Sequence, residues 1–171
     1  MKNTLLVVIA ILVVTAGAFG QAKRGQLGIQ TGVTFTAVSA SPFADVGGVF
    51  MITDAFALRA AAGFLNTTSG GSSTLGYDLG AGVEYHFAGK GGVSPYAGAQ
   101  LSYSGASVPT GAPAQSAFGL NAVLGAEYFF STNFAWGGEL SIGYVSSTQG
   151  TTTTTFFGTN ELTSYLTWFI N

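Results

Sequence analysis

The stretch from Ser116 to Ser147 alternates between two kinds of side chain. Most even positions carry large apolar or aromatic residues, whereas most odd positions carry glycine, small or polar residues. Phe129 is the clear exception on the odd positions, and the segment 131–133 separates the two halves. A period of two over such a length, interrupted by three turn-forming residues, predicts a β-hairpin with one bulky face and one small, polar face.

The same alternation recurs along the chain and predicts eight strands. Their expected ranges are 26–38, 45–52, 56–64, 75–87, 93–104, 116–130, 134–147 and 161–171. Short turns are expected at 53–54, 88–92 and 131–133, and longer loops at 66–74, 105–115 and 147–160, with the shortest of this second set at 39–44. Short turns at one rim and longer loops at the other predict an all-β fold, an eight-stranded antiparallel up-and-down barrel.

The composition indicates which face of the strands points outward. Only 7% of the residues are charged, against about 25% in a typical soluble domain. A soluble barrel or sandwich would bury the bulky face and leave the small face to water, and that face carries too few Lys and Glu for this. We therefore expect the bulky face to meet lipid and the glycine-rich face to fill a narrow lumen.

The aromatic residues of the bulky face are expected to form two belts at the two membrane interfaces. The belt beside the short turns consists of Phe56, Phe87, Phe130, Phe134, Trp136 and Trp168. The belt towards the longer loops consists of Phe35, Phe64, Tyr77, Tyr103, Phe118 and Tyr144.

Residues 1–20 resemble an export signal, with a basic start at Lys2, an unbroken apolar run over 5–14 and small residues before a cleavage point after Ala18 or Gly20. The apolar run is shorter than the roughly 20 residues of a spanning helix. An uncleaved anchor is the alternative. The remaining residues, 21–171, are then one barrel domain, which has no cysteine to form disulfides.

A cluster of charges is expected inside the barrel. Arg59, Glu84, Glu127 and Glu139 all take the inward parity near the short-turn rim. Because an unpaired buried ion costs several kcal/mol, we expect Arg59 to pair with Glu84, with Glu127 and Glu139 nearby. The cluster is either structural or a gate for ions. If the pair forms, Arg59→Met is expected to lower stability or raise conductance.

Signals for catalysis, cofactors or metals are missing from the sequence. His86 is the single histidine, and the residue two positions further on is Ala88 rather than a serine nucleophile. The glycine-rich segment 88–92 lacks the spacing of a phosphate-binding loop, and no metal-ligand spacing occurs. The few basic residues argue against nucleic acid. We expect no enzyme activity, no catalytic residues, no cofactor and no metal.

The export signal, the eight alternating segments, the asymmetry of turns and loops and the ending Leu166-x-Trp168-x-Ile170 resemble those of the small outer-membrane β-barrels of the OmpA and OmpX type. These barrels usually end on an aromatic residue, whereas this sequence ends Phe169-Ile170-Asn171. The resemblance covers the whole barrel domain and is architectural.

The resemblance implies a monomer in the outer membrane, surrounded by its lipid and inserted by the barrel-assembly machinery. A structural or surface-interaction role is expected, in which the long loops meet an external ligand or surface and the lumen is filled. A narrow, porin-like channel or small-solute transporter is the second hypothesis. A soluble secreted ligand-binding barrel is the third.

Overall fold

A computed structural model describes residues 22–36, 43–69, 71–107 and 114–170, and the signal peptide expected at 1–20 lies outside these ranges. The strands are β1 (Leu27–Thr36), β2 (Phe43–Met51), β3 (Phe56–Ser69), β4 (Ser72–His86), β5 (Val93–Ser107), β6 (Gln115–Phe129), β7 (Phe134–Gln149) and β8 (Thr152–Ile170). No helix in the described ranges is long and apolar enough to cross a membrane.

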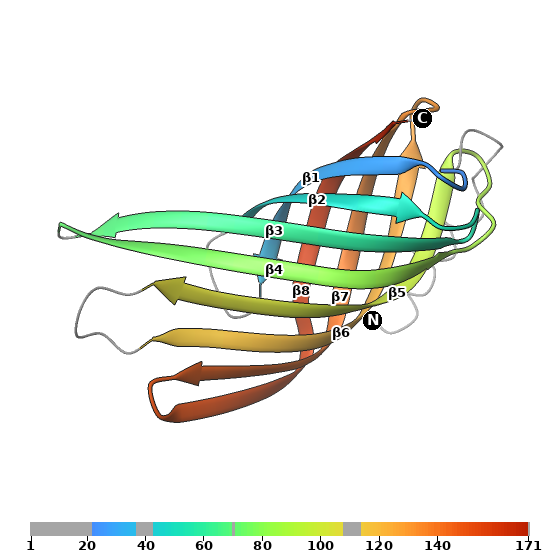
Figure 1. Ribbon diagram of the computed structural model, residues 1–171. Helices are drawn as coiled ribbons and strands as arrows, with labels where there is room; N and C mark the ends of the chain where they lie inside the picture. Colours follow the sequence, from blue (N-terminus) through green and yellow to red (C-terminus); the bar gives the residue numbers. More distant parts are fainter. Residues whose placement is uncertain (1–21, 37–42, 70, 108–113, 171) are drawn as a thin grey trace, which may run out of the picture.

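The strands form one closed sheet in which each strand pairs antiparallel with its sequence neighbours (Figure 1). The barrel closes where β1 pairs with β8, from Leu27 opposite Ile170 to Thr36 opposite Glu161. Closure gives the backbone groups of the first and last strands a partner inside the protein, which a segment surrounded by hydrocarbon requires. The prediction of an eight-stranded antiparallel up-and-down barrel is confirmed.

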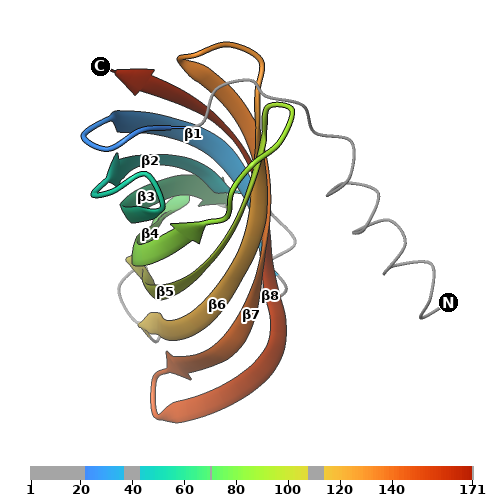
Figure 2. The same ribbon diagram turned by 90° about the vertical axis from the view of Figure 1, so that its right-hand side faces the viewer.

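The two ends of the barrel differ in the length of their connections. At one end, here called the short-turn end, residues 52–55, 87–92 and 130–133 join β2 to β3, β4 to β5 and β6 to β7. The opposite end, here called the hairpin end, is formed by β1–β2, β3–β4, β5–β6 and β7–β8. Figure 1 shows the ends of the paired strands β3–β4, β5–β6 and β7–β8 on the left, and Figure 2 looks towards the short-turn end.

Two of the predicted long loops are wrong, because the chain there continues as strand. β3 and β4 are paired as far as Ser69 opposite Ser72, so most of 66–74 is a hairpin. β7 and β8 are likewise paired as far as Gln149 opposite Thr152, so the loop predicted at 147–160 is mostly strand. Threonine is β-branched and favours extended backbone even where the strand surface is polar. Gly71 and Gly150 supply the positive φ at these tips.

The remaining boundaries differ less. β1 starts one residue later than the predicted 26–38, and the end of that prediction, residues 37–38, lies outside the described residues. β2 begins at Phe43, inside the predicted loop 39–44. β5 extends to Ser107 and β6 begins at Gln115, which shortens the predicted loop 105–115, of which 108–113 are not described.

A β-bulge interrupts the pairing of β7 with β8. Ser141 lies opposite Glu161, but the next residue, Ile142, lies opposite Thr159, so Asn160 is the extra residue. Asn160 is buried, and Glu161 is partly buried and lines the lumen. The bulge therefore places two consecutive side chains of β8 inside the barrel, where regular alternation would place one.

The orientation of the strands is as predicted. Leu124 and Trp136 are each 55% exposed on the outside, whereas Glu127 and Glu139 are 2% and 4% exposed inside. An exterior of contiguous apolar side chains around the barrel is suited to hydrocarbon rather than water. The indole N–H of Trp136 on this surface donates to Ser164 Oγ at 3.1 Å.

All of the residues predicted to form the aromatic belts lie on the outer face. Each is exposed except Tyr77, which is half-buried beside Tyr103 with 6.2 Å between ring centroids. Near the short-turn end, Phe134 stacks between Phe130 and Trp168. Their contact with membrane interfaces stays a prediction.

Candidate functional site in the barrel lumen

An apolar cluster fills the lumen at the short-turn end. This plug cluster consists of Ala22, Val49, Met51, Ala57, Phe129, Ala135 and Phe169. The rings of Phe129 and Phe169 stack with 5.5 Å between their centroids. Each member is at most 5% exposed.

The plug cluster could not be predicted from the alternation, although Phe129 is the bulky exception on the inward face. Met51 and Phe169 also have inward parity, but single apolar residues on a mostly small face are not a pattern until the barrel brings five strands together. The plug is thus a property of the closed circumference rather than of any one strand.

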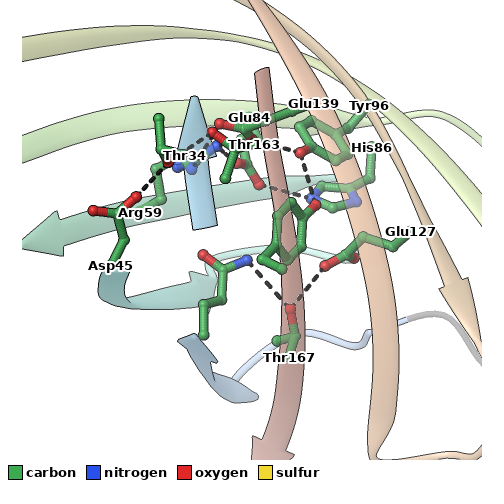
Figure 3. A network of polar contacts seen from close by, with 12 residues as sticks. Thr34, Asp45, Arg59, Glu84, His86, Tyr96, Glu127, Glu139, Thr163 and Thr167 are labelled. Atoms are coloured by element: carbon green, nitrogen blue, oxygen red, sulfur yellow. Dashed lines mark hydrogen bonds and ion pairs between the residues drawn. The ribbon is translucent and has the colours of Figure 1, made fainter. Parts of the chain in front are cut away.

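Figure 3 shows the charge cluster, which consists of Arg59, Glu84, Glu127 and Glu139. The cluster lies next to the plug on the side of the hairpin end, because Arg59 and Glu127 are two residues along their strands from the plug members Ala57 and Phe129. Arg59 lies between two carboxylates: its Nη1 atom donates to Glu84 Oε1 at 2.8 Å and also to Glu139 Oε2, while Nη2 donates to Glu139 Oε1 at 3.1 Å. The expected pair of Arg59 and Glu84 is present. Glu139 contributes a second, two-pronged contact, which sequence analysis had placed only nearby.

Glu127 is separate from this ion pair. Its Oε1 accepts a hydrogen bond from Thr167 Oγ1 at 3.3 Å, and Oε2 has no partner among the described residues. Gln30 Nε2 donates to the same threonine oxygen at 3.3 Å. Three of the four predicted residues, Arg59, Glu84 and Glu139, therefore form one ion-paired group. The carboxyl group of Glu127 is instead bound by Thr167.

Two tyrosines lie across the lumen at the level of the ion pair. Tyr96 OH donates to Glu139 Oε2 at 2.7 Å and lies 2.7 Å from Tyr165 OH. Each tyrosine ring covers a glycine of the neighbouring strand, Tyr96 over Gly125 and Tyr165 over Gly137. The glycines are needed because a Cβ atom at either position would overlap the ring.

This packing predicts different effects for two adjacent glycines. Gly137→Ala is expected to lower the free energy of unfolding by about 1–3 kcal/mol, since the added methyl displaces Tyr165. Gly138→Ala is the matched control, because the nearest atom to its Cβ would be Thr163 O at 3.7 Å. Urea unfolding of both variants in detergent micelles measures the difference. Equal stability would show that the ring moves aside freely.

His86 belongs to a buried polar group that the sequence did not reveal. Its Nδ1 lies 3.2 Å from Ser94 Oγ and its Nε2 lies 3.2 Å from Glu84 Oε2. Serine, histidine and glutamate in this order resemble a nucleophile with its base. However, Ser94 is 1% exposed and does not line the cavity of the lumen. The serine beside His86 is thus eight residues away across the β4–β5 turn, rather than two residues along the same strand.

Above the ion pair the lumen opens into a cavity of about 400 Å³, here called the outer cavity. Arg59, Glu139 and Tyr165 form its floor, and its wall extends towards the hairpin end. Asp45, Asp78 and Glu161 line the wall. None of the plug residues reaches it, so the cavity is separated from the short-turn end by the ion pair and the plug.

The wall carboxylates are not arranged as a metal site. Among the described residues, no group of three or more His, Cys, Asp or Glu side chains is close enough together to hold a metal ion. Asp45 instead accepts a short hydrogen bond from Thr34 Oγ1, which in turn lies 2.9 Å from Thr163 Oγ1.

Comparison with known proteins gives similarity in structure without similarity in sequence. No protein-family model and no curated protein matches the chain. The N-terminal β-barrel domain of Pseudomonas aeruginosa OprF superposes with a TM-score of 0.59 at 17% identity, covering 87% of this chain and 100% of that one. The outer membrane protein OprG of the same organism gives 0.60 at 11%, covering 89% and 98%.

A transmembrane β-barrel designed de novo superposes with a TM-score of 0.51 at 16% identity, covering 88% of this chain and 99% of that one. Identities this low establish the fold alone. The superpositions agree with the closed antiparallel sheet, the apolar exterior and the polar lumen. The chain has the fold of the small eight-stranded outer-membrane β-barrels.

Proposed function

We propose that the protein is a monomeric outer-membrane barrel with a closed lumen, whose role is structural or lies in contacts made by its hairpin end. In this proposal residues 1–20 export the chain and are removed, the barrel-assembly machinery inserts residues 21–171, and lipid surrounds the bulky face. The apolar exterior supports the location, because its exposed leucine, isoleucine and aromatic side chains suit hydrocarbon.

The observation that carries the closed lumen is the double block at the short-turn end. An ion needs a polar path, and it would meet first the Arg59 ion pair and then the plug cluster. In this proposal neither the Arg59 ion pair nor the plug cluster has a catalytic role. The charge cluster serves to satisfy the polar interior, since each buried charge needs a partner.

The hairpin end supports the surface-contact role. β3–β4 and β7–β8 continue as paired strands to Ser69, Ser72, Gln149 and Thr152. Phe157, near the tip of β8, is 76% exposed. Rigid hairpins present side chains to an external ligand or surface with less loss of conformational entropy than loops of the same length.

Two measurements test this proposal. A folded barrel should migrate differently on a detergent gel with and without boiling and should fractionate with membranes. In planar bilayers it should show no steady conductance, because the plug blocks the lumen. A soluble protein with no gel shift would contradict the membrane location, and stable single-channel steps would contradict the closed lumen.

A narrow channel is the second candidate, and the outer cavity favours it because much of the lumen is already open. In that case the Arg59 ion pair would be the gate, and the plug would have to move as well. Arg59→Met should then raise the conductance of the folded protein, whereas the closed-lumen proposal expects no increase while the plug cluster is intact.

A further inference from the structure

The outer part of β8 is paired on one side only. β1 pairs with β8 as far as Thr36 opposite Glu161. Over the next nine residues, 152–160, β8 pairs with β7 alone among the described strands. Figure 1 shows β7–β8 and β3–β4 reaching further to the left than β1 and β2. The other edge of 152–160 therefore presents backbone N–H and C=O groups of alternate residues without a partner strand.

This edge, here called the β8 edge, carries none of the usual protection against pairing. Exposed strand edges are commonly protected by charged residues or proline. Residues 152–160 are five threonines, two phenylalanines, one glycine and one asparagine. Every residue from Thr152 to Phe157 is exposed, and Phe157, at 76%, is the most exposed large apolar side chain in the described ranges. An uncharged edge rich in strand-forming residues is a template for a further strand.

β3 has a second, shorter edge. β2 pairs with β3 as far as Asp45 opposite Gly63, and over residues 64–69 β3 pairs with β4 alone among the described strands. Beyond the ends of β1 and β2, the described wall is thus an open sheet that runs from β3 to β8. Six residues at the edge of β3 offer fewer main-chain hydrogen bonds than nine at the β8 edge, so the β8 edge is the stronger site.

The position of β1 limits what can occupy the β8 edge. An added strand continues the line of β1 and, like β1, runs antiparallel to β8. It meets the end of β1 at Thr36 and must stop or turn away there. A wall strand of a second barrel continues through the membrane and would overlap β1, so a second copy does not fit. An extended segment of another polypeptide can end at this point.

The bulge at Asn160 lies at the junction between the two parts of β8. It follows directly after the last pair of β1 with β8, Thr36 opposite Glu161. Bulges are common where pairing ends at a sheet edge. Because of the bulge, Phe157 lies on the outer face opposite Tyr144, where a side chain of an added strand can pack beside it.

We propose that the β8 edge binds an extended segment of another protein by strand addition. Main-chain hydrogen bonds to residues 152–160 supply the affinity. Phe157 packs against a β-branched or aromatic side chain of the segment. The edge has no charge to pair with a charged residue, so the segment it fits is uncharged. This inference rests on the surface-contact role proposed above and assigns that role to one edge and one class of partner.

Fluorescence anisotropy of a labelled nine-residue peptide of alternating threonine and valine, added to the folded barrel in detergent, tests the proposal. N-methylation of every second residue leaves one edge of the peptide free to donate and prevents the peptide from stacking on itself. Saturable binding of this probe is expected. A fully N-methylated peptide of the same sequence should not bind, because it has no N–H groups, and it reports the uptake of peptide by micelles.

Point variants test the contact at the edge. Phe157→Ala should lower the affinity for the probe about two- to fivefold, the effect of losing one cross-strand contact. Phe118→Ala is the matched control, because Phe118 is 47% exposed on the outer face of β6, whose two edges are both paired at this residue. It should leave the affinity unchanged.

Shortened hairpins locate the site. Replacing residues 146–155 with a two-residue Asn-Gly turn closes the β7–β8 hairpin at Val145 opposite Phe156 and shortens the β8 edge from nine residues to five. The affinity for the probe should fall at least tenfold. The matched control replaces residues 67–74 with the same turn, which closes β3–β4 at Asn66 opposite Leu75 and leaves the β8 edge intact. It should bind the probe as the unaltered protein does.

Three results would overturn the inference: no saturable binding, equal binding of the fully N-methylated peptide, or an equal loss in both shortened hairpins. A barrel that dimerises through the β8 edge in the absence of peptide, seen by sedimentation, would also overturn it. The heat-dependent gel shift separates this inference from the proposed function. A protein that shows the shift but does not bind the probe contradicts strand addition alone, whereas a protein without the shift contradicts the membrane barrel as well.

Discussion

Replacing Arg59 with methionine is expected to lower the free energy of unfolding by about 3–5 kcal/mol, because it leaves two buried carboxylates without their cation. Glu84 and Glu139 are 3% and 4% exposed and both bind the guanidinium group. Methionine fills much of the same volume but cannot donate. Urea unfolding in detergent micelles, followed by the fluorescence of Trp136 and Trp168, measures the loss.

A second variant separates charge from packing. Arg59→Met combined with Glu84→Gln and Glu139→Gln removes the cation and both anions and should regain most of the stability lost by the single substitution. Arg24→Met is the control at an exposed arginine. If the free energy of unfolding of Arg59→Met lies within about 0.5 kcal/mol of that of the unaltered protein, the ion pair contributes little to stability and the charge cluster needs another explanation.

Phe129→Ala is expected to have an effect of similar size, a loss of about 3–5 kcal/mol, because it opens a cavity in the plug cluster. Phe129 is 2% exposed and stacks on Phe169. The surrounding plug residues are held by separate strands of a closed barrel, which limits their collapse into the vacated space. Urea unfolding under the same conditions measures the effect.

Phe130→Ala is the matched control for this prediction, since Phe130 is the next residue and is 56% exposed on the outer face. Its loss should be smaller, because no internal cavity forms. If Phe129→Ala and Phe130→Ala destabilise the barrel equally, the plug does not contribute as a packed cluster. Conductance of the folded Phe129→Ala variant would additionally report whether the plug closes the lumen.

The orientation of the strands could be predicted from the sequence because it depends on a single, local property. A period of two assigns every residue to one of two faces, and the low charge content decides which face is outside. Leu124 outside and Glu139 inside follow from that reasoning alone. Register added little uncertainty, since slipping by one residue would have turned every bulky side chain inward.

The length of the hairpins could not be predicted in the same way. Residues 151–155 are all threonine and appeared to be a polar loop, yet β8 begins at Thr152. Beyond the apolar band a strand no longer needs bulky outward residues, so the alternation fades while the pairing continues. Composition alone does not separate a polar strand from a polar loop there.

The candidate site was predictable only in part. The inward parity of Arg59 and Glu84 placed both in the lumen, and their equal distance from the β3–β4 tip suggested the pair. The contact of Arg59 with Glu139 spans 80 residues and depends on where the closed sheet brings β7 in relation to β3. The gathering of the plug residues depends on the same circumference, whereas the contact of His86 with Ser94 is local to the β4–β5 hairpin.

The bulge at Asn160 acts as a phase shift in the pattern of β8. Between the bulge and the short-turn end the odd-numbered residues of β8 face the lumen, and between the bulge and the hairpin end the even-numbered residues do. Gly158 therefore lies opposite Gly143, and Phe157 lies opposite Tyr144. If regular alternation ran through Asn160 without the bulge, Asn160 would point outward and Phe157 would point into the mouth of the barrel. The single extra amide thus lets two segments with opposite frames of alternation share one continuous wall.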